Sequence, residues 1–210
     1  MLGLNKQELR ILKKLNTPRK IQDFLNKLQI NFEKKGETCM SPRKVLREKK
    51  AHCIEGALLA ALCLKLHGEK PLLVDLKTTK DDFEHVIAVF KKNGKYGAVS
   101  KTNHAVLRYR EPLYRDIREL VMSFFHEYTD NKGRKTLRSF SVPVNLDRFN
   151  KKDWMTDEED LWYIHDYLDN VKHYPILDRK QISGLRKADK IEIKAGKIAE
   201  YQENLEFTTH

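Results

Sequence analysis

The sequence has few cysteines, and their spacing excludes two common structural roles. Cysteine occurs three times, as Cys39, Cys53 and Cys63, and no two of these residues form a Cys-x-x-Cys pair. An odd number of thiols without paired spacing supports neither a disulfide framework nor a zinc knuckle. We therefore expect reduced thiols and no metal site.

Long apolar runs and glycine-rich loops are also absent. No apolar run reaches the roughly 18 residues that a transmembrane helix needs, and residues 1–6 lack the continuous apolar core of a secretory signal. The sequence contains no phosphate-binding glycine loop, internal repeat or low-complexity segment. We therefore expect a cytoplasmic protein that binds no membrane and needs no organic cofactor.

The charge is large and unevenly distributed. The 210 residues are 40% hydrophobic and 34% charged, which is typical of a globular protein with one substantial core. The formal net charge is +11, and residues 1–50 contain 14 Lys and Arg against 5 Asp and Glu. This basic region fits either solvated helix faces or the binding of an anionic partner. The oligomeric state stays open.

Capping patterns suggest how the chain is organised. Thr17-Pro18 and Ser41-Pro42 each place a hydroxyl before a proline, and together with a first cap they predict three helices within residues 1–50. We expect the central fold in residues 51–146 and a helical or extended addition in residues 147–210. The three parts are predicted to form one compact domain.

Short apolar runs predict strands after residue 70. Residues 72–76 and 85–90 have the composition of buried strands. Asn93-Gly94 stands between two apolar runs and predicts a hairpin that ends near residue 100.

The later elements are predicted from weaker signals. Residues 115–128 have helical periodicity, and residues 137–146 read as an extended edge segment because of Pro143. A Thr156-x-x-Glu159 capping box predicts an acidic helix over residues 156–171, and residues 191–193 fit a short strand.

Residues 51–61 place a cysteine where a strongly apolar helix begins. A thiol at a helix N-terminus feels the positive end of the helix dipole, which lowers its pKa and favours the thiolate. His85 opens an apolar strand that could hold an imidazole against this helix. The pair predicts Cys53 as a nucleophile and His85 as general base and then acid.

The segment 51–103 resembles the transglutaminase-like superfamily, relatives of the papain-like thiol enzymes, and its flanks resemble a compact microbial branch. The shared features are a cysteine that opens a small-residue helix ending at Gly68, a strand, His85, a hairpin and a third polar residue. The resemblance implies an α+β fold, in which an antiparallel sheet packs against the central cysteine-bearing helix. N-terminal helices and a C-terminal helical or extended region would surround this core.

The resemblance also implies a third residue that orients His85, and two positions compete for this role. Ser100 lies fifteen residues after His85, where relatives carry an aspartate, but serine supplies no charge. Asn103 would give a papain-like Cys-His-Asn arrangement. For the oxyanion site, Gln29 and Asn31 are the candidate amides.

Other polar residues have expected structural roles. We expect Cys63 in the core and Cys39 in a polar loop open to oxidation. Asp75 lies inside an apolar run and needs a partner such as Arg108 or Arg110.

Two polar residues flank Cys53 in the sequence. His52 is expected to line the site or the cap region, because adjacent helix positions point about 100° apart. Glu55 fits three roles: a helix cap, a cleft wall or a site for a substrate amine.

These expectations favour an amide or peptide hydrolase, or an acyltransferase, that works through a thioester on Cys53. Hydrolysis is the first hypothesis because it requires only water as acceptor. The alternative is a non-catalytic binding module in which Ser100 leaves the triad incomplete and the basic N-terminal helices bind an anionic partner. A third hypothesis is an RNA-binding protein with an incidental cysteine.

Overall fold

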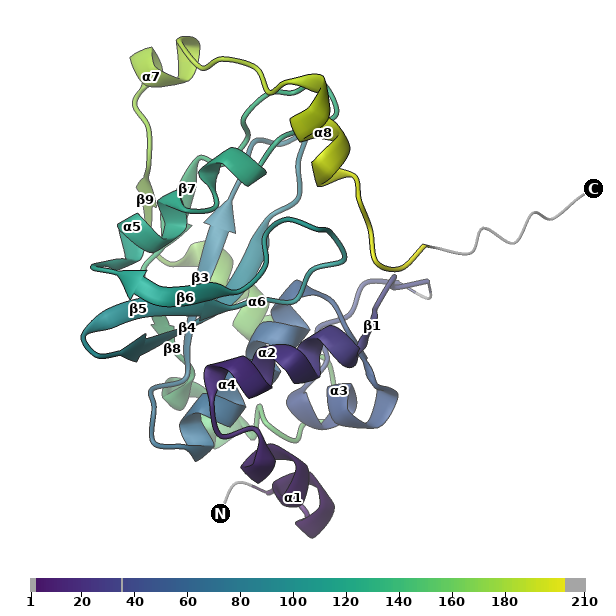
Figure 1. The fold of residues 1–210 in the computed structure, drawn as a ribbon. Coiled ribbons are helices and arrows are strands. Elements are labelled where there is room, and N and C mark those ends of the chain that lie inside the picture. The colour runs from purple at the N-terminus through teal and green to yellow at the C-terminus, as the bar shows by residue number, and fades with distance from the viewer. Residues whose placement is uncertain (1–2, 35, 203–210) are drawn as a thin grey trace, which may run out of the picture.

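The chain folds around an antiparallel sheet with helices on both faces, so its fold class is α+β (Figure 1). The computed structural model describes residues 3–34 and 36–202. The helices are α1 (Lys6–Lys14), α2 (Pro18–Lys27), α3 (Pro42–Glu48), α4 (Cys53–Leu66), α5 (Ile117–Met122), α6 (Trp162–Asn170), α7 (Arg179–Ser183) and α8 (Lys190–Gly196), with 3-10 helices η1 (Phe125–Glu127) and η2 (Leu146–Lys152). The strands are β1 (Gln29–Ile30), β2 (Lys50–Ala51), β3 (Leu72–Lys77), β4 (His85–Lys92), β5 (Lys95–Val99), β6 (Arg110–Tyr114), β7 (Ser139–Ser141), β8 (Val144–Asn145) and β9 (His173–Pro175).

The main sheet is built around the neighbouring strands β3 and β4. Among the described residues it has seven strands, in the order β6-β5-β4-β3-β7-β9, and β8 also pairs with β3. Every pairing in this sheet is antiparallel. The predicted hairpin joins β4 to β5, and Asn93 and Gly94 at its turn both have positive φ, as a tight hairpin turn requires.

Alternate residues of the central strands enter two hydrophobic clusters. Leu73 and Val86 belong to the cluster that contains α4, whereas Val74 and Ile87 belong to the cluster that contains α5. This alternation follows from the two-residue period of a strand. Figure 1 shows the N-terminal helices and α4 on one side of the sheet and α5 on the other.

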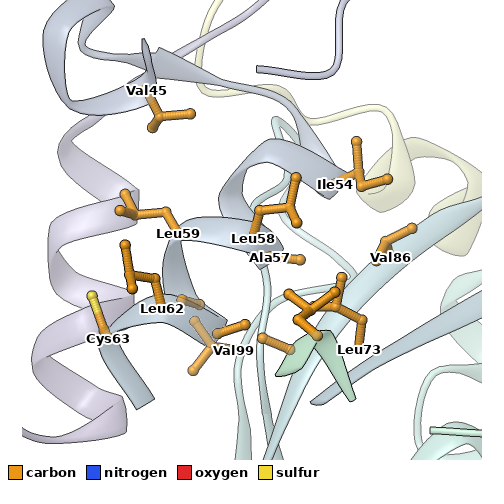
Figure 2. Packing of buried hydrophobic residues seen from close by; sticks show 14 of the residues in the cluster. Val45, Ile54, Ala57, Leu58, Leu59, Leu62, Cys63, Leu73, Val86 and Val99 are labelled. Atoms are coloured by element: carbon orange, nitrogen blue, oxygen red, sulfur yellow. The ribbon is translucent and has the colours of Figure 1, made fainter. Parts of the chain in front are cut away.

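Helix α4 is the centre of the larger cluster. All its residues from Ile54 to Leu64 are buried, which explains why the helix is apolar on every face. Figure 2 shows Leu59 on the side toward Val45 of α3, and Ala57 on the side toward Val86 of the sheet. The predicted cysteine-bearing helix packed against a sheet is therefore confirmed.

The helix predicted over residues 156–171 is wrong at its start, because α6 begins later. Asp153 adopts a left-handed conformation, with φ of 49°, and its carbonyl accepts the Thr156 N–H at 2.8 Å. The Leu161 N–H donates to the Cys39 carbonyl at 2.7 Å. These bonds hold the segment in turns, so the capping pattern at Thr156 opens no helix.

Three other local predictions also need correction. Residues 191–193 form part of α8 rather than a strand, and the Asp189 N–H donates to the Glu192 carboxylate at 2.6 Å as in a capping box. Pro143 divides the extended segment predicted over residues 137–146 into β7, which pairs with β3 and β9, and β8, for which the described residues show pairing with β3 alone. The helix predicted over residues 115–128 is divided into α5 and η1.

The C-terminal part of the chain contributes to the same sheet. Strand β9 pairs with β7, although residues 147–210 were predicted as an addition to the fold. Residues 203–210 lie outside the described residues. None of the described helices has the length and hydropathy needed to cross a membrane.

Candidate active site

Cys53 is the first residue of α4, and the chain just before it is firmly anchored. Helix α3 ends at Lys49, whose left-handed conformation turns the chain into β2. Strand β2 pairs in parallel with β1, and the Asn31 N–H donates to the Ala51 carbonyl. The half-buried Cys53 side chain is therefore presented at a fixed helix N-terminus.

The structure brings Cys53, His85 and Ser100 together in one relay. His85 opens β4, is 6% exposed and lines the same cleft as Cys53. Its Nε2 lies 2.7 Å from Ser100 Oγ, and Ser100 Oγ lies 2.5 Å from the Leu107 carbonyl oxygen. A carbonyl only accepts, so the Ser100 hydroxyl proton goes to Leu107, and Ser100 accepts the Nε2–H of His85. This leaves Nδ1 of His85 for the thiol.

Both backbone polar groups of Ser100 are hydrogen-bonded to the side chain of Gln22 of α2. The Ser100 N–H donates to Gln22 Oε1 at 2.9 Å, and Gln22 Nε2 donates to the Ser100 carbonyl at 2.8 Å. Leu107 is fixed as well, because its N–H donates to Glu127 at 2.6 Å. Gln22 and Glu127 were missed by the sequence reasoning, since no local pattern connects residues so far apart in the chain.

Asn103 is not part of the relay. Its Nδ2 donates to the Tyr201 carbonyl at 2.9 Å, and its Oδ1 accepts the Tyr201 N–H at 2.9 Å. Its amide is therefore used to hold the segment that follows α8. Of the two candidates for orienting His85, the structure places Ser100 against the imidazole and turns Asn103 toward the C-terminal segment.

A second imidazole, that of His52, lies on another side of Cys53. Its Nε2 is 2.9 Å from the Thr38 carbonyl oxygen, 3.4 Å from Glu55 Oε1 and 3.5 Å from Glu33 Oε1. Burial by itself lowers the pKa of His52, but the bonds to Cys53 and Glu55 outweigh it and raise that pKa to about 11. These surroundings favour the charged imidazolium form of His52, which is also the N-cap residue of α4, one of the two positions predicted for it.

The two histidines change the chemistry of the Cys53 thiol. Burial alone raises its pKa, but the hydrogen bonds from His52 and His85 hold the pKa well below its usual value. The other thiols behave in the opposite way. Burial raises the pKa of Cys63 to about 12, and the pKa of Cys39 is raised further. Cys39 is fully buried, so the prediction of an oxidisable loop cysteine is wrong.

Glu55 holds the first turn of α4 and the His52 imidazolium. Its carboxylate accepts the His52 N–H at 2.9 Å, the Met40 N–H at 3.0 Å and the Thr38 hydroxyl at 2.7 Å. Burial raises the pKa of Glu55, but the bonds from His52 and these backbone donors prevail and lower it to about 2. Of the three roles considered for Glu55, the structure places it as a buried cap.

Two clefts meet at Cys53. One, of about 410 Å³, is lined by Cys53, His85, Leu107 and Tyr128. The other, of about 390 Å³, lies on the His52 side of Cys53 and includes Trp162. Cys53 is therefore accessible from two directions.

The two amides predicted for an oxyanion site are directed elsewhere. Asn31 Nδ2 donates to the Thr38 hydroxyl at 2.8 Å and to Glu55. Gln29 is an exposed residue of β1. Within residues 3–34 and 36–202, neither lines the cleft over His85.

Asp75 has other partners than those predicted. Its carboxylate lies 3.1 Å from His173 Nε2 and 3.3 Å from Lys77 Nζ, whereas Arg108 pairs with Glu200. The expected pairing with Arg108 or Arg110 is therefore wrong. The Arg110 guanidinium instead lies over a phenylalanine ring of the α5 cluster.

One group of carboxylates has the arrangement that could hold a cation. Asp75, Glu84 and Asp169 converge, and the Lys77 ammonium contacts all three. The Lys77 ammonium thus occupies the position among these three carboxylates that a cation would take.

Comparison with known proteins gives no family assignment, since no protein-family model and no curated protein matches the chain.

Proposed function

We propose that this protein is a transglutaminase-like thiol enzyme that acts on a peptide or amide substrate. The acyl group of the substrate forms a thioester with Cys53 and is then transferred to an acceptor or released by hydrolysis. The observation that carries the proposal is the relay of Cys53, His85 and Ser100 at the edge of an open cleft. Its three free cysteines fit a reducing compartment, so a cytoplasmic location is part of the proposal.

The relay can carry out both halves of an acyl transfer. His85 takes the proton of the Cys53 thiol, and the resulting thiolate attacks the substrate carbonyl carbon. The tetrahedral intermediate then expels the amine, which takes that proton from His85. In the second half, His85 removes a proton from the acceptor as that acceptor attacks the thioester. Ser100 keeps the imidazole in the orientation and tautomer that both halves need.

In a Cys-His-Asp triad the aspartate supplies a charge beside the catalytic imidazole, whereas in this mechanism the fixed charge lies beside the thiol. Ser100 is neutral, but His52, backed by Glu55 and Glu33, places a fixed positive charge beside the thiol. The thiolate is therefore stabilised by an imidazolium that does not have to give up its proton. This leaves His85 available for proton transfer.

The alternative is a binding module whose basic N-terminal helices bind an anionic partner. Several basic side chains of this region are already paired: Lys44 with Asp160 at 2.8 Å and Arg47 with Glu158 at 2.8 Å. This pairing reduces the positive charge available to a partner, so we favour the enzyme. A salt titration with a polyanion separates the two, because binding dominated by phosphate contacts weakens steeply with salt.

The proposal is tested by trapping the thioester. The protein is mixed with p-nitrophenyl acetate, and p-nitrophenol release and the mass of the Cys53 peptide are followed. We expect a burst of p-nitrophenol and one acetyl group on Cys53, both lost in Cys53→Ala and both kept in the matched thiol variant Cys63→Ala. Absence of an acetyl-Cys53 species in the wild-type protein overturns the proposal.

The acceptor is identified in the same assay. Hydroxylamine is added to the acetylated enzyme, and acetohydroxamate is compared with acetate. We propose water as the acceptor, so acetate should dominate at low hydroxylamine. Predominant hydroxamate at a low amine concentration assigns the enzyme to amine acyl transfer.

A further inference from the structure

Tyr128 is a polar residue of the catalytic cleft to which the proposed mechanism gives no role. It directly follows η1 and lines the cleft shared by Cys53 and His85. Its side chain is buried, with 2% of the residue exposed. Throughout residues 3–34 and 36–202, its Oη is the buried side-chain polar atom for which no hydrogen-bond partner exists.

An unpaired hydroxyl in this place is informative because its neighbours are all engaged. Glu127, the preceding residue, pairs with Arg110 at 2.6 Å and accepts the Leu107 N–H. Asp130 binds Arg134 at 2.5 Å. Leaving a buried hydroxyl unsatisfied costs free energy, so a partner absent from the resting protein is the simplest reason for its position.

We propose that Tyr128 Oη donates a hydrogen bond to the substrate carbonyl oxygen as that oxygen becomes the oxyanion of the tetrahedral intermediate. The inference rests on the proposed function and names the oxyanion donor that Gln29 and Asn31 do not provide. Backbone N–H groups in the first turn of α4, which have no intrahelical partners, are the natural second donors.

The hydrogen-bond acceptor for Tyr128, the oxyanion of the tetrahedral intermediate, forms only during the reaction. The Cys53 sulfur forms a bond to the carbonyl carbon, and the π pair of the C=O bond moves onto oxygen. Negative charge thus passes from sulfur to oxygen, and the Tyr128 O–H keeps its proton while its hydrogen bond strengthens. When the C–N bond breaks, the carbonyl re-forms and the amine leaves with the proton from His85. Interactions that form in the transition state accelerate the chemical step.

The environment keeps Tyr128 in the donor form. Burial raises the pKa of the Tyr128 phenol well above its usual value, and negative charge at Cys53 and Asp82 raises it further. The hydroxyl therefore retains its proton when a thiolate is present nearby.

The test compares two reactions of the same thiol in Tyr128→Phe. Acetylation by p-nitrophenyl acetate passes through an oxyanion, whereas alkylation by iodoacetamide attacks a saturated carbon and forms none. We expect acetylation of Cys53 to slow roughly 10²- to 10³-fold, with the alkylation rate unchanged. Tyr163→Phe is the matched control, because it removes a hydroxyl that lies outside both clefts and makes only a 3.4 Å contact to the Lys152 carbonyl.

Thermal unfolding provides a second readout of the premise. Since Tyr128 Oη has no partner to lose, Tyr128→Phe should keep or raise the Tm. A lower Tm, or equal loss of acetylation and alkylation, assigns the hydroxyl a structural role and overturns the inference.

Failure of the inference and failure of the proposed function look different. Wild-type acetylation rates in Tyr128→Phe overturn the oxyanion role alone. Absence of acetylation in the wild-type protein overturns both.

Discussion

At the residue scale, the main departure from a charged triad is that a neutral serine orients the imidazole. Spacing along the chain pointed to Ser100 and amide chemistry pointed to Asn103, and the sequence could not decide between them. The deciding contacts come from Gln22 of α2 and from Leu107 in the loop between β5 and β6. The role of His52 was missed for a similar reason, because one of its two carboxylate partners, Glu33, is brought in by the loop after β1.

The two candidates can be separated by substitution. Ser100→Ala removes the acceptor of the His85 Nε2–H, which is worth about 1–1.5 kcal/mol, so the midpoint pH of Cys53 alkylation should rise by about one unit. Ser100→Asp should restore or lower the midpoint by adding charge. Asn103→Ala should leave it unchanged and instead speed hydrogen exchange at Tyr201, whose N–H it binds. A larger shift in Asn103→Ala than in Ser100→Ala contradicts this assignment.

The buried Glu55 carboxylate predicts how stability depends on pH. Its pKa is about 2 in the folded protein, against about 4.3 in an unfolded chain. Its contribution is therefore complete above the unfolded value and is lost as pH falls toward 2. Glu55→Gln should destabilise the protein by about 3–5 kcal/mol at pH 7, because it removes the buried one of the two carboxylates that face His52. Urea unfolding at several pH values should show this difference shrinking below about pH 4.3; a constant difference contradicts the prediction.

At the scale of elements, the helix and strands around the site were predictable because local and tertiary preferences agree there. The apolar α4 begins at Cys53 and ends before Gly68, whose φ of 86° favours glycine. The prediction failed for residues 156–161, where a tertiary bond to Cys39 competes with a local capping pattern. It also failed at Ile191 and Ile193, because the prediction gave more weight to these β-branched residues than to the Asp189–Glu192 capping box, which opens a helix.

The packing of α4 against Lys101, the residue after Ser100, predicts an unusual effect of alanine. A Cβ added at Gly56 would lie 2.4 Å from Lys101 Cβ. Alanine normally stabilises a helix by about 1 kcal/mol over glycine, but here overpacking should destabilise the protein by about 1–3 kcal/mol. Gly184→Ala is the control, because its new Cβ has ordinary contacts at 3.6 Å. Urea unfolding of both variants checks this, and a stabilised Gly56→Ala contradicts the packing.

At the scale of the whole molecule, the fold gives the three cysteines different exposure, so we expect one reactive and two inert thiols. Cys39 and Cys63 are fully buried, whereas Cys53 borders both clefts. Titration with a disulfide reagent at neutral pH should therefore modify one thiol quickly in the native protein and all three after unfolding in urea. Rapid modification of a second native thiol contradicts this burial pattern.

The most direct test of the account is the pH dependence of Cys53 alkylation by iodoacetamide, followed by peptide mass spectrometry. The wild-type protein is compared with His85→Ala and His52→Ala. An activated thiol predicts a wild-type midpoint clearly below the usual pKa of about 8.5, shifted upward in each variant. A wild-type midpoint near 8.5 that neither variant changes contradicts a thiolate held by two histidines, and with it the proposed enzyme.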